Sequence, residues 1–366
     1  MNQTGAGCAS LLAELIGFDT VNPGGDEPAL CHHLAGKLEA IGADSVTVGT
    51  TPRPGQTGAW VFARFGTPEL LVNAHVDTVP ANRGWTRNPH QAEVTSEHVY
   101  GLGSADTKGA IACILTALGD VKPQNVGILF SGDEERSSTV LPKFLETPEA
   151  KAAKHAIVCE PTTRRAGIRH RGVLCYQAEI RGQGGHSSKA DTMPKPIVTM
   201  AKLAVALAEL GESFVPEGPA DMKGLCFNIA GIDGGVAFNV VPELARLTWS
   251  ARQPPGFDTQ VLEERQLELA ASIDSDIVIT KVLDQPPFAI RDQAHLQALI
   301  GDYPQIWSPL DFWTEAAVFS QAGIDAVVIG PGDIAQAHAA DEFVTLSDLD
   351  WATSMFRDVF TNTHAS

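Results

Sequence analysis

The sequence predicts an α/β fold in which a mostly parallel sheet is flanked by helices, with a smaller two-layer α+β domain inserted into it. In the first part of the chain, short apolar runs alternate with segments of helical periodicity, which is typical of βα units. After Gly167 the order becomes strand, helix, strand, strand, helix, strand, which suits a compact α+β domain. The α/β pattern resumes after the Pro286-Pro287 pair. We therefore expect one domain formed by residues 1–167 plus 286–366 and an inserted domain of residues 168–285.

The elements of the first domain follow from two periodicities. Leucines recur at three- and four-residue spacing where we expect helices, at residues 9–18, 27–41 and 109–118. Short apolar runs predict buried strands at residues 59–65, 69–74, 125–131 and 155–159. Near the end of the chain, a strand at residues 326–329 and a helix at residues 346–360 return to the same sheet.

The inserted domain is predicted from a different sequence pattern. Residues 171–181 alternate between apolar and polar, as in a half-buried strand. The further elements expected are helices at residues 194–210 and 259–273 and strands at residues 225–232, 244–251 and 277–282.

Composition excludes several classes of partner. The chain has 44 acidic and 26 basic residues and a net charge of -18, so we expect neither nucleic acid nor a membrane surface as a partner. The N-terminus lacks the features of a signal peptide, and no apolar run approaches the length of a membrane span. The six cysteines include no CxxC pair and several have apolar neighbours, which favours reduced thiols and a cytoplasmic protein.

The first motif with chemical potential is His75-Val76-Asp77, at the end of an apolar strand. Side chains at the carboxyl end of a parallel strand project into the crevice where α/β proteins bind ligands. His75 and Asp77 share a face of the strand, so Asp77 could orient the imidazole toward a metal. A solvated strand end with an isolated histidine is the alternative.

The second motif is the glycine-rich turn from Gly101 to Gly109, which precedes a helix. A nucleotide-binding loop is disfavoured because Asp106 stands where the dinucleotide fingerprint needs glycine, and GxxxxGK[ST] is absent. Asp106 remains as an acidic residue that either has a chemical role or simply caps the helix.

Three more strand ends carry polar side chains: Asp133-Glu134-Glu135, Glu160 and, after a glycine turn, His338. The three consecutive carboxylates could instead belong to a solvated acidic loop. Parallel strands, however, would bring all of them to the edge of the sheet where His75 lies. Two histidines and several carboxylates without a thiolate suit Zn, Co or Mn, and a shared carboxylate is typical of two-metal hydrolases.

Taken together, the ordered motifs resemble those of the acetylornithine deacetylase and succinyl-diaminopimelate desuccinylase metallohydrolase family, over nearly the whole chain. They are His75 to Pro80, Tyr100 to Gly109, Asp133-Glu134-Glu135, Glu160-Pro161-Thr162, Gly182 to Ser188, and Gly330 to His338 with Asp341-Glu342. Residues 314–316 and 330–338 resemble the acetylornithine deacetylases most. The chain as a whole also resembles the acetylcitrulline deacetylase variant of arginine biosynthesis. The resemblance implies a zinc-exopeptidase-like catalytic domain with an inserted lid or dimerisation domain. It also implies hydrolysis of a small-molecule N-acetyl-L-amino acid.

The resemblance also assigns roles to individual residues. It implies two divalent metal ions, Zn or Co, with His75 and Glu160 on one, Glu135 and His338 on the other, and Asp106 bridging both. Glu134 would be the base that takes a proton from the attacking water and returns it to the leaving amine. Asp77 would orient His75, and His186 would stabilise the oxyanion, reaching the partner subunit's site in a homodimer formed through the inserted domain. The peptide bond between Asp106 and Thr107 is expected to be cis.

Substrate-binding residues are less well defined. Asn239, Arg252 and Arg171 are candidates for binding the substrate carboxylate, but Ser250-Ala251-Arg252 departs from the Asp-x-Arg that relatives often carry. All three could equally be surface or strand-face residues.

Three functions compete at this point. The first is an N-acyl amino acid deacetylase, the second a dinuclear metallo-dipeptidase or carboxypeptidase of the same fold, and the third a non-catalytic binding protein on the scaffold. Glu160 favours the first, because the family's peptidases tend to carry Asp at that ligand position. An intact Glu134 disfavours the third.

Overall fold

A computed structural model describes residues 3–136 and 138–363. Its contacts divide the chain into two compact units. The first unit extends to Ile168 and includes Ala289–Ser308 and the chain from Thr314 onward, while the second consists of Arg169–Phe288 and Pro309–Trp313. The short return segment belongs to the second unit because Leu310 N–H donates to Arg169 O (2.8 Å) and Trp313 Nε1 donates to Pro286 O (3.0 Å).

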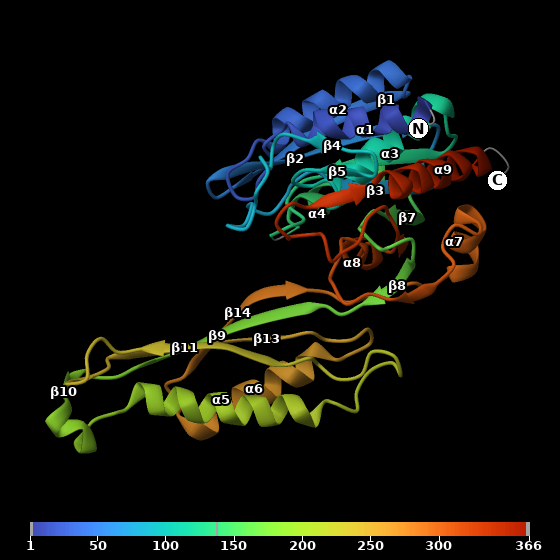
Figure 1. The fold of residues 1–366 in the computed structure, drawn as a ribbon. Helices are drawn as coiled ribbons and strands as arrows, with labels where there is room; N and C mark the ends of the chain where they lie inside the picture. Colours follow the sequence, from blue (N-terminus) through green and yellow to red (C-terminus); the bar gives the residue numbers. More distant parts are fainter. Residues whose placement is uncertain (1–2, 137, 364–366) are drawn as a thin grey trace. The chain divides into compact units, whose positions relative to one another are not determined.

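The first unit is built on a mixed sheet whose centre is parallel, as predicted (Figure 1). The strand order is β1-β2-β6-β3-β7-β17-β8-β15, with β16 paired to β8. Pairing is parallel for β6 with β3, β3 with β7 and β7 with β17, and antiparallel for β1 with β2, β2 with β6 and β17 with β8. The strands are β1 Ser45–Arg53, β2 Gln56–Phe65, β3 Leu70–His75, β6 Val126–Ser131, β7 His155–Val158, β8 Ala166–His170, β15 Phe288–Ala289, β16 Trp307–Pro309 and β17 Asp325–Val328.

Helices cover this sheet because its central strands, such as β3, β6 and β17, are buried along their whole length. Val61, Ala63 and Phe65 of β2 pack into one core with α1, α2, α3 and α9, while Trp60 and Phe62 contact Phe144 of α4. The helices are α1 Gln3–Ile16, α2 Glu27–Ile41, α3 Lys108–Asp120, α4 Val140–Leu145, α7 Gln293–Ile300, α8 Ala316–Gln321 and α9 Leu346–Asn362, with a 3-10 turn at Pro148–Ala150. A small sheet of β18 (Phe343–Thr345), β5 (His98–Tyr100) and β4 (Glu93–Val94) completes the unit.

The second unit is a two-layer α+β structure. Its antiparallel sheet has the order β11-β13-β9-β14, and α5 and α6 pack against one face (Figure 1). Tyr176, Trp249 and Leu207 lie in its separate hydrophobic core. The elements are β9 Val173–Arg181, β10 Gly185–His186, a 3-10 turn at Ser187–Thr192, α5 Pro196–Ser213, β11 Asn228–Gly234, β12 Val240–Val241, β13 Leu244–Ala251, α6 Thr259–Ile273 and β14 Val278–Gln285.

Two further expectations can be compared with the described residues. All six cysteines are free thiols, and Cys8, Cys31, Cys113 and Cys159 are buried, as the apolar context of several of them predicted. Within residues 3–136 and 138–363, no helix combines the length and apolar character needed to cross a membrane.

Candidate functional site

The parallel register brings three strand ends to one edge of the central sheet. His75 at the end of β3 pairs in register with Ser131 at the end of β6, and Asn73 pairs with Val158 at the end of β7. Glu134 and Glu135 follow β6, and Glu160 follows β7. Side chains that are remote in sequence therefore meet at the carboxyl ends of neighbouring strands, as this class of fold requires.

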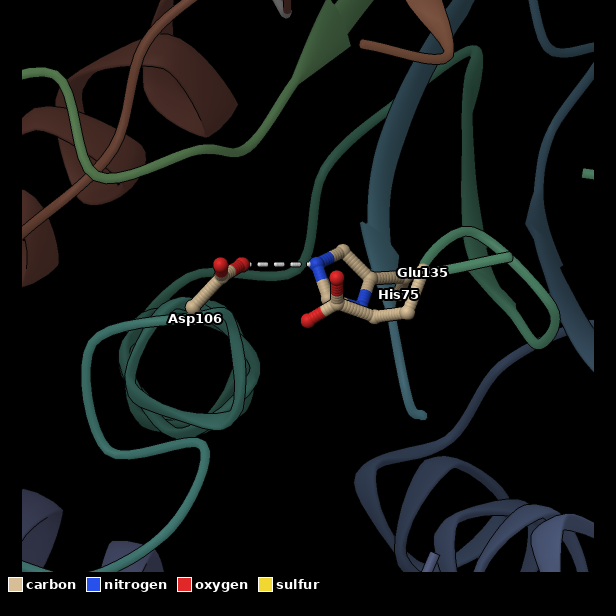
Figure 2. A group of neighbouring side chains, drawn as sticks. All are labelled: His75, Asp106 and Glu135. Carbon is tan, nitrogen blue, oxygen red and sulfur yellow. Dashed lines mark hydrogen bonds and ion pairs between the residues drawn. The ribbon is translucent and has the colours of Figure 1, made fainter. Parts of the chain in front are cut away.

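Asp106 lies between two histidines. His75 Nε2 is 2.8 Å from Asp106 Oδ1, and His338 Nε2 is 3.6 Å from Asp106 Oδ2. The same His338 nitrogen lies 2.9 Å from Glu135 Oε2. Donor atoms of His75, Asp106 and Glu135 all lie within 4.8 Å of one another, and Figure 2 shows these three side chains converging.

The acidic groups of this site are destabilised as anions. Burial and the charge of Asp106 raise the pKa of Glu135, and the same two causes raise the pKa of Glu160 well above its usual range. Burial together with the charge of Glu160 likewise raises the pKa of Glu134 well above its usual range. Groups that repel one another in a buried site require positive charge if all are to ionise.

The pKa values of the two histidines are also raised, which for an imidazole favours the charged form. The hydrogen bond to Glu135 raises the pKa of His338 to about 9. Burial opposes a charged His75, but its hydrogen bonds to Asp106 and Asp77 outweigh burial and raise its pKa well above the usual range. Both imidazoles therefore favour the charged form beside these carboxylates, and their nitrogens lie where neutral imidazoles would bind cations.

Asp77 contacts both His75 and the segment that follows β6, and its role in orienting the imidazole stays a prediction. His75 Nδ1 lies 3.0 Å from the backbone carbonyl of Asp77 and 3.6 Å from its Oδ1. The Asp77 carboxylate accepts the backbone N–H groups of Glu134 (3.1 Å) and Glu135 (3.2 Å) and the side-chain amide of Asn22 (2.9 Å). Asp77 therefore links the end of β3 to the segment that follows β6.

Several supporting residues were not singled out from the sequence. Glu342 accepts the backbone N–H groups of Gly103, Ala105 and Asp106, and so holds the turn that presents Asp106. Thr107 bonds the backbone of His75 through its hydroxyl, and the Asp106–Thr107 peptide bond is cis, as expected. Glu342 could have been suspected from the Asp341-Glu342 pair. The role of Thr107 depends on a β3 contact that the sequence does not reveal.

The remaining candidate residues lie in the second unit. His186 is exposed on β10, where its Nδ1 lies 2.8 Å from Ser188 Oγ, and Asn239 accepts Ser187 N–H through its backbone carbonyl. Arg171 donates its guanidinium N–H groups to the backbone carbonyls of Lys223, Gly224 and Arg252, which is a local structural role. Their predicted contacts with substrate stay predictions.

The donor chemistry of the first unit fits divalent cations. Among the residues that the structure describes, the donors that converge there are imidazole nitrogens and carboxylate oxygens with no thiolate, which suits Zn, Co or Mn. The raised pKa values of Glu134, Glu135 and Glu160 indicate that these anions need positive charge in addition to that of the histidines. We conclude that this group of side chains can hold metal.

Comparison with known proteins identifies the family of the chain. The family model described as "Peptidase family M20/M25/M40" matches residues 71–362. The chain is 31% identical to N-acetyl-L-citrulline deacetylase of Xanthomonas campestris over 96% of its length and 97% of that protein. It is 30% identical to acetylornithine deacetylase of Proteus mirabilis over 88% of its length and 86% of that protein.

The fold is likewise similar to a solved M20 family metallo-carboxypeptidase from Sulfolobus solfataricus. The TM-score is 0.79 at 18% sequence identity, and all of both chains is covered. The chain is therefore a hydrolase that belongs to peptidase family M20/M25/M40.

Proposed function

We propose that this protein hydrolyses the amide bond of an N-acetyl-L-amino acid and releases acetate and the free amino acid. One observation carries the proposal: the buried Asp106 lies between the buried His75 and the exposed His338, with the acidic residues Glu134 and Glu135 in the same site. The relatives named N-acetyl-L-citrulline deacetylase and acetylornithine deacetylase suggest the substrates N-acetyl-L-citrulline or N-acetyl-L-ornithine. Either substrate would place the enzyme in arginine biosynthesis.

We further propose which residues hold two divalent ions, Zn or Co. His75 and Glu160 would bind one ion, Glu135 and His338 the other, and Asp106 both. When bound, the ions would supply Lewis acidity and offset the ligand carboxylates. The 2.8 Å and 3.6 Å separations of Asp106 from the two histidines support a bridging position.

Glu134 is assigned the proton transfers. Its backbone is fixed by Asp77, and it is adjacent in sequence to the proposed ligand Glu135. A raised pKa suits a group that accepts a proton from the attacking water and delivers it to the leaving amine. His186 as an oxyanion donor and a homodimer formed through the second unit complete the proposal. An intact Glu134 also disfavours a binding protein without catalytic activity.

We expect N-acetyl-citrulline to be the slightly better of the two substrates. A pocket without an acidic residue near the substrate tail would favour citrulline, because burial of an ammonium group without a partner is costly, whereas a ureido group needs only hydrogen bonds. The test compares kcat/KM for N-acetyl-citrulline, N-acetyl-ornithine and a dipeptide under identical metal conditions.

Each outcome of that comparison has a defined meaning. A tenfold preference for N-acetyl-ornithine, about 1.4 kcal/mol in transition-state stabilisation, would reverse the order. Turnover of the dipeptide alone would instead identify a metallo-dipeptidase of the same fold. Failure on both acetylated substrates would remove the link to arginine biosynthesis.

Replacement of Asp77 by Asn should weaken metal binding or turnover about 10- to 100-fold, as is typical when a residue behind the metal ligands is changed. One oxygen that accepts a backbone N–H of Glu134 or Glu135 becomes an NH₂ group that cannot accept it. Metal content and kcat are measured together. Asp44→Asn is the matched control, because Asp44 also accepts a backbone N–H, from Gly66, but at an exposed site. Equal behaviour of the two variants would contradict this role.

A further inference from the structure

Glu315 is a buried carboxylate that the proposed chemistry does not use. It is 1% exposed and directly precedes α8 in the first unit. Its Oε2 accepts the hydroxyl of Ser131 (2.7 Å), and its Oε1 accepts the hydroxyl of Ser138 (2.9 Å). Ser131 Oγ in turn accepts the side-chain amide of Asn73 (2.8 Å) on β3. A carboxylate removed from water in this way depends on such partners.

The two serines lie on either side of the segment that contains Glu134 and Glu135. Ser131 is the last residue of β6, and Ser138 follows the acidic run that contains Glu134 and Glu135. Glu315 therefore joins the beginning and the end of this segment through a single side chain. Ser138 N–H also donates to Asp133 O (2.5 Å), which closes the same turn through the backbone.

The backbone of this segment needs such support. Asp133 and Ser138 have positive φ angles of 67° and 45°, a conformation that non-glycine residues adopt rarely and at some cost. Thr139 bonds the Asp133 carboxylate through both its N–H and its hydroxyl, and Asn22 and Arg53 also donate to Asp133. The turn is thus fixed from within by Asp133 and from outside by Glu315.

Glu315 lies close enough to the proposed active site for its charge to act on Glu134 and Glu160, but its side chain is buried. Burial is the main cause of the raised pKa of Glu134 and of Glu160, and the charge of Glu315 adds to both. Its two oxygens are nevertheless occupied by serine hydroxyls, and almost none of its surface is accessible. A contact with the side chain of an acetylated amino acid is therefore disfavoured.

We propose that Glu315 is a positioning residue whose bonds to Ser131 and Ser138 fix the segment that presents Glu134 and Glu135. The inference rests on the proposed function, because it explains how the base and a metal ligand hold their places. Small displacements of such groups are expensive, since a shift of about 1 Å can reduce turnover about 100-fold.

The test uses Glu315→Gln and Ser138→Ala in the full-length protein. The glutamine keeps the size of the side chain but loses the charge and one acceptor oxygen. Ser138→Ala leaves Glu315 in place and breaks one bond of the clamp, by which we mean the two bonds of Glu315 with Ser131 and Ser138. Ser354→Ala is the matched control, because its hydroxyl bonds only Asp350 O on the exposed face of α9 among the contacts described. Thermal unfolding establishes that each variant is folded.

Three readouts are compared. Hydrogen exchange at the amides of residues 133–136 and 138–139 should accelerate in both clamp variants and not in the control. Co(II) affinity, followed by visible absorption, should fall about 10-fold or more, as for other residues that support metal ligands. For the better substrate, kcat should fall about 10- to 100-fold while KM changes little. The double variant should lose less than the sum of the single losses in log kcat, because both changes disable one clamp.

Two results would overturn the proposal. One is unchanged amide exchange and Co(II) affinity in the folded Glu315→Gln and Ser138→Ala variants. The other is a raised KM for N-acetyl-ornithine alone with normal kcat in Glu315→Gln, which would make Glu315 a substrate contact. Exchange and Co(II) binding require no turnover. A wild-type protein that fails to deacetylate therefore refutes the proposed function while these two readouts still decide the role of Glu315.

Discussion

Glu134→Ala should retain its metal and lose several orders of magnitude in turnover, whereas Glu135→Ala should lose metal. The two side chains are neighbours in sequence but differ in surroundings. Glu135 Oε2 lies 2.9 Å from His338 Nε2 and belongs to the group of donor atoms with His75 and Asp106. The Glu134 backbone N–H donates to Asp77 Oδ1 (3.1 Å), and burial together with the charge of Glu160 raises the pKa of its carboxyl well above the usual range, which suits a group that accepts a proton.

The size of the effect follows from the two proton transfers assigned to Glu134. Each such transfer typically contributes about 10²- to 10⁴-fold, so removal of the carboxylate should affect kcat far more than KM. Glu134→Gln is the isosteric companion variant, since it keeps the packing but cannot accept the proton.

Metal content per chain and kcat are measured for all variants after identical loading. Glu146→Ala is the control, because Glu146 is an exposed glutamate paired with Lys143. Equal loss of metal from the Glu134 and Glu135 variants would remove the distinction between base and ligand.

The parts of the fold that could be predicted are those with strong local signals. The bounds of α2, β13 and α6 agree with the sequence analysis, because amphipathic periodicity or strict alternation extends over their full length. The edge strand β1 was missed, since its residues are exposed or half-buried and give no apolar run. The short helices α4 and α8 were missed for a related reason: each has only 6 residues, too few to show a helical period.

The candidate site likewise has a part that could be predicted from the sequence and a part that could not. His75, Asp106, Glu135 and His338 could be brought together from the sequence because parallel strands end at one edge of the sheet. The side chains that hold these residues in place could not be predicted from the sequence. Arg53 reaches Asp133 across 80 residues, and Glu315 reaches Ser131 across 184, with no periodicity that relates such pairs. Ordered motifs predict strand ends well, whereas contacts between side chains depend on packing that no local pattern records.

Removal of the metal should abolish activity, and Zn or Co should restore it. The buried carboxylates of Glu135 and Glu160 repel Asp106, and burial with that repulsion raises the pKa of each. Divalent cations would offset this repulsion and stabilise the folded state, because a ligand that binds only the native protein adds to its stability.

The experiment dialyses the protein against a chelator, then titrates Zn or Co while activity, metal content and melting temperature are recorded. We expect activity to return as about two equivalents bind, with a higher melting temperature in the loaded protein. Mg is the control cation, because it prefers an octahedral set of oxygen ligands and suits a site with two imidazoles poorly. Full turnover in rigorously metal-free protein would contradict the dinuclear assignment. Recovery at one equivalent would assign catalysis to a single ion and leave Asp106 as an ordinary ligand rather than a bridge.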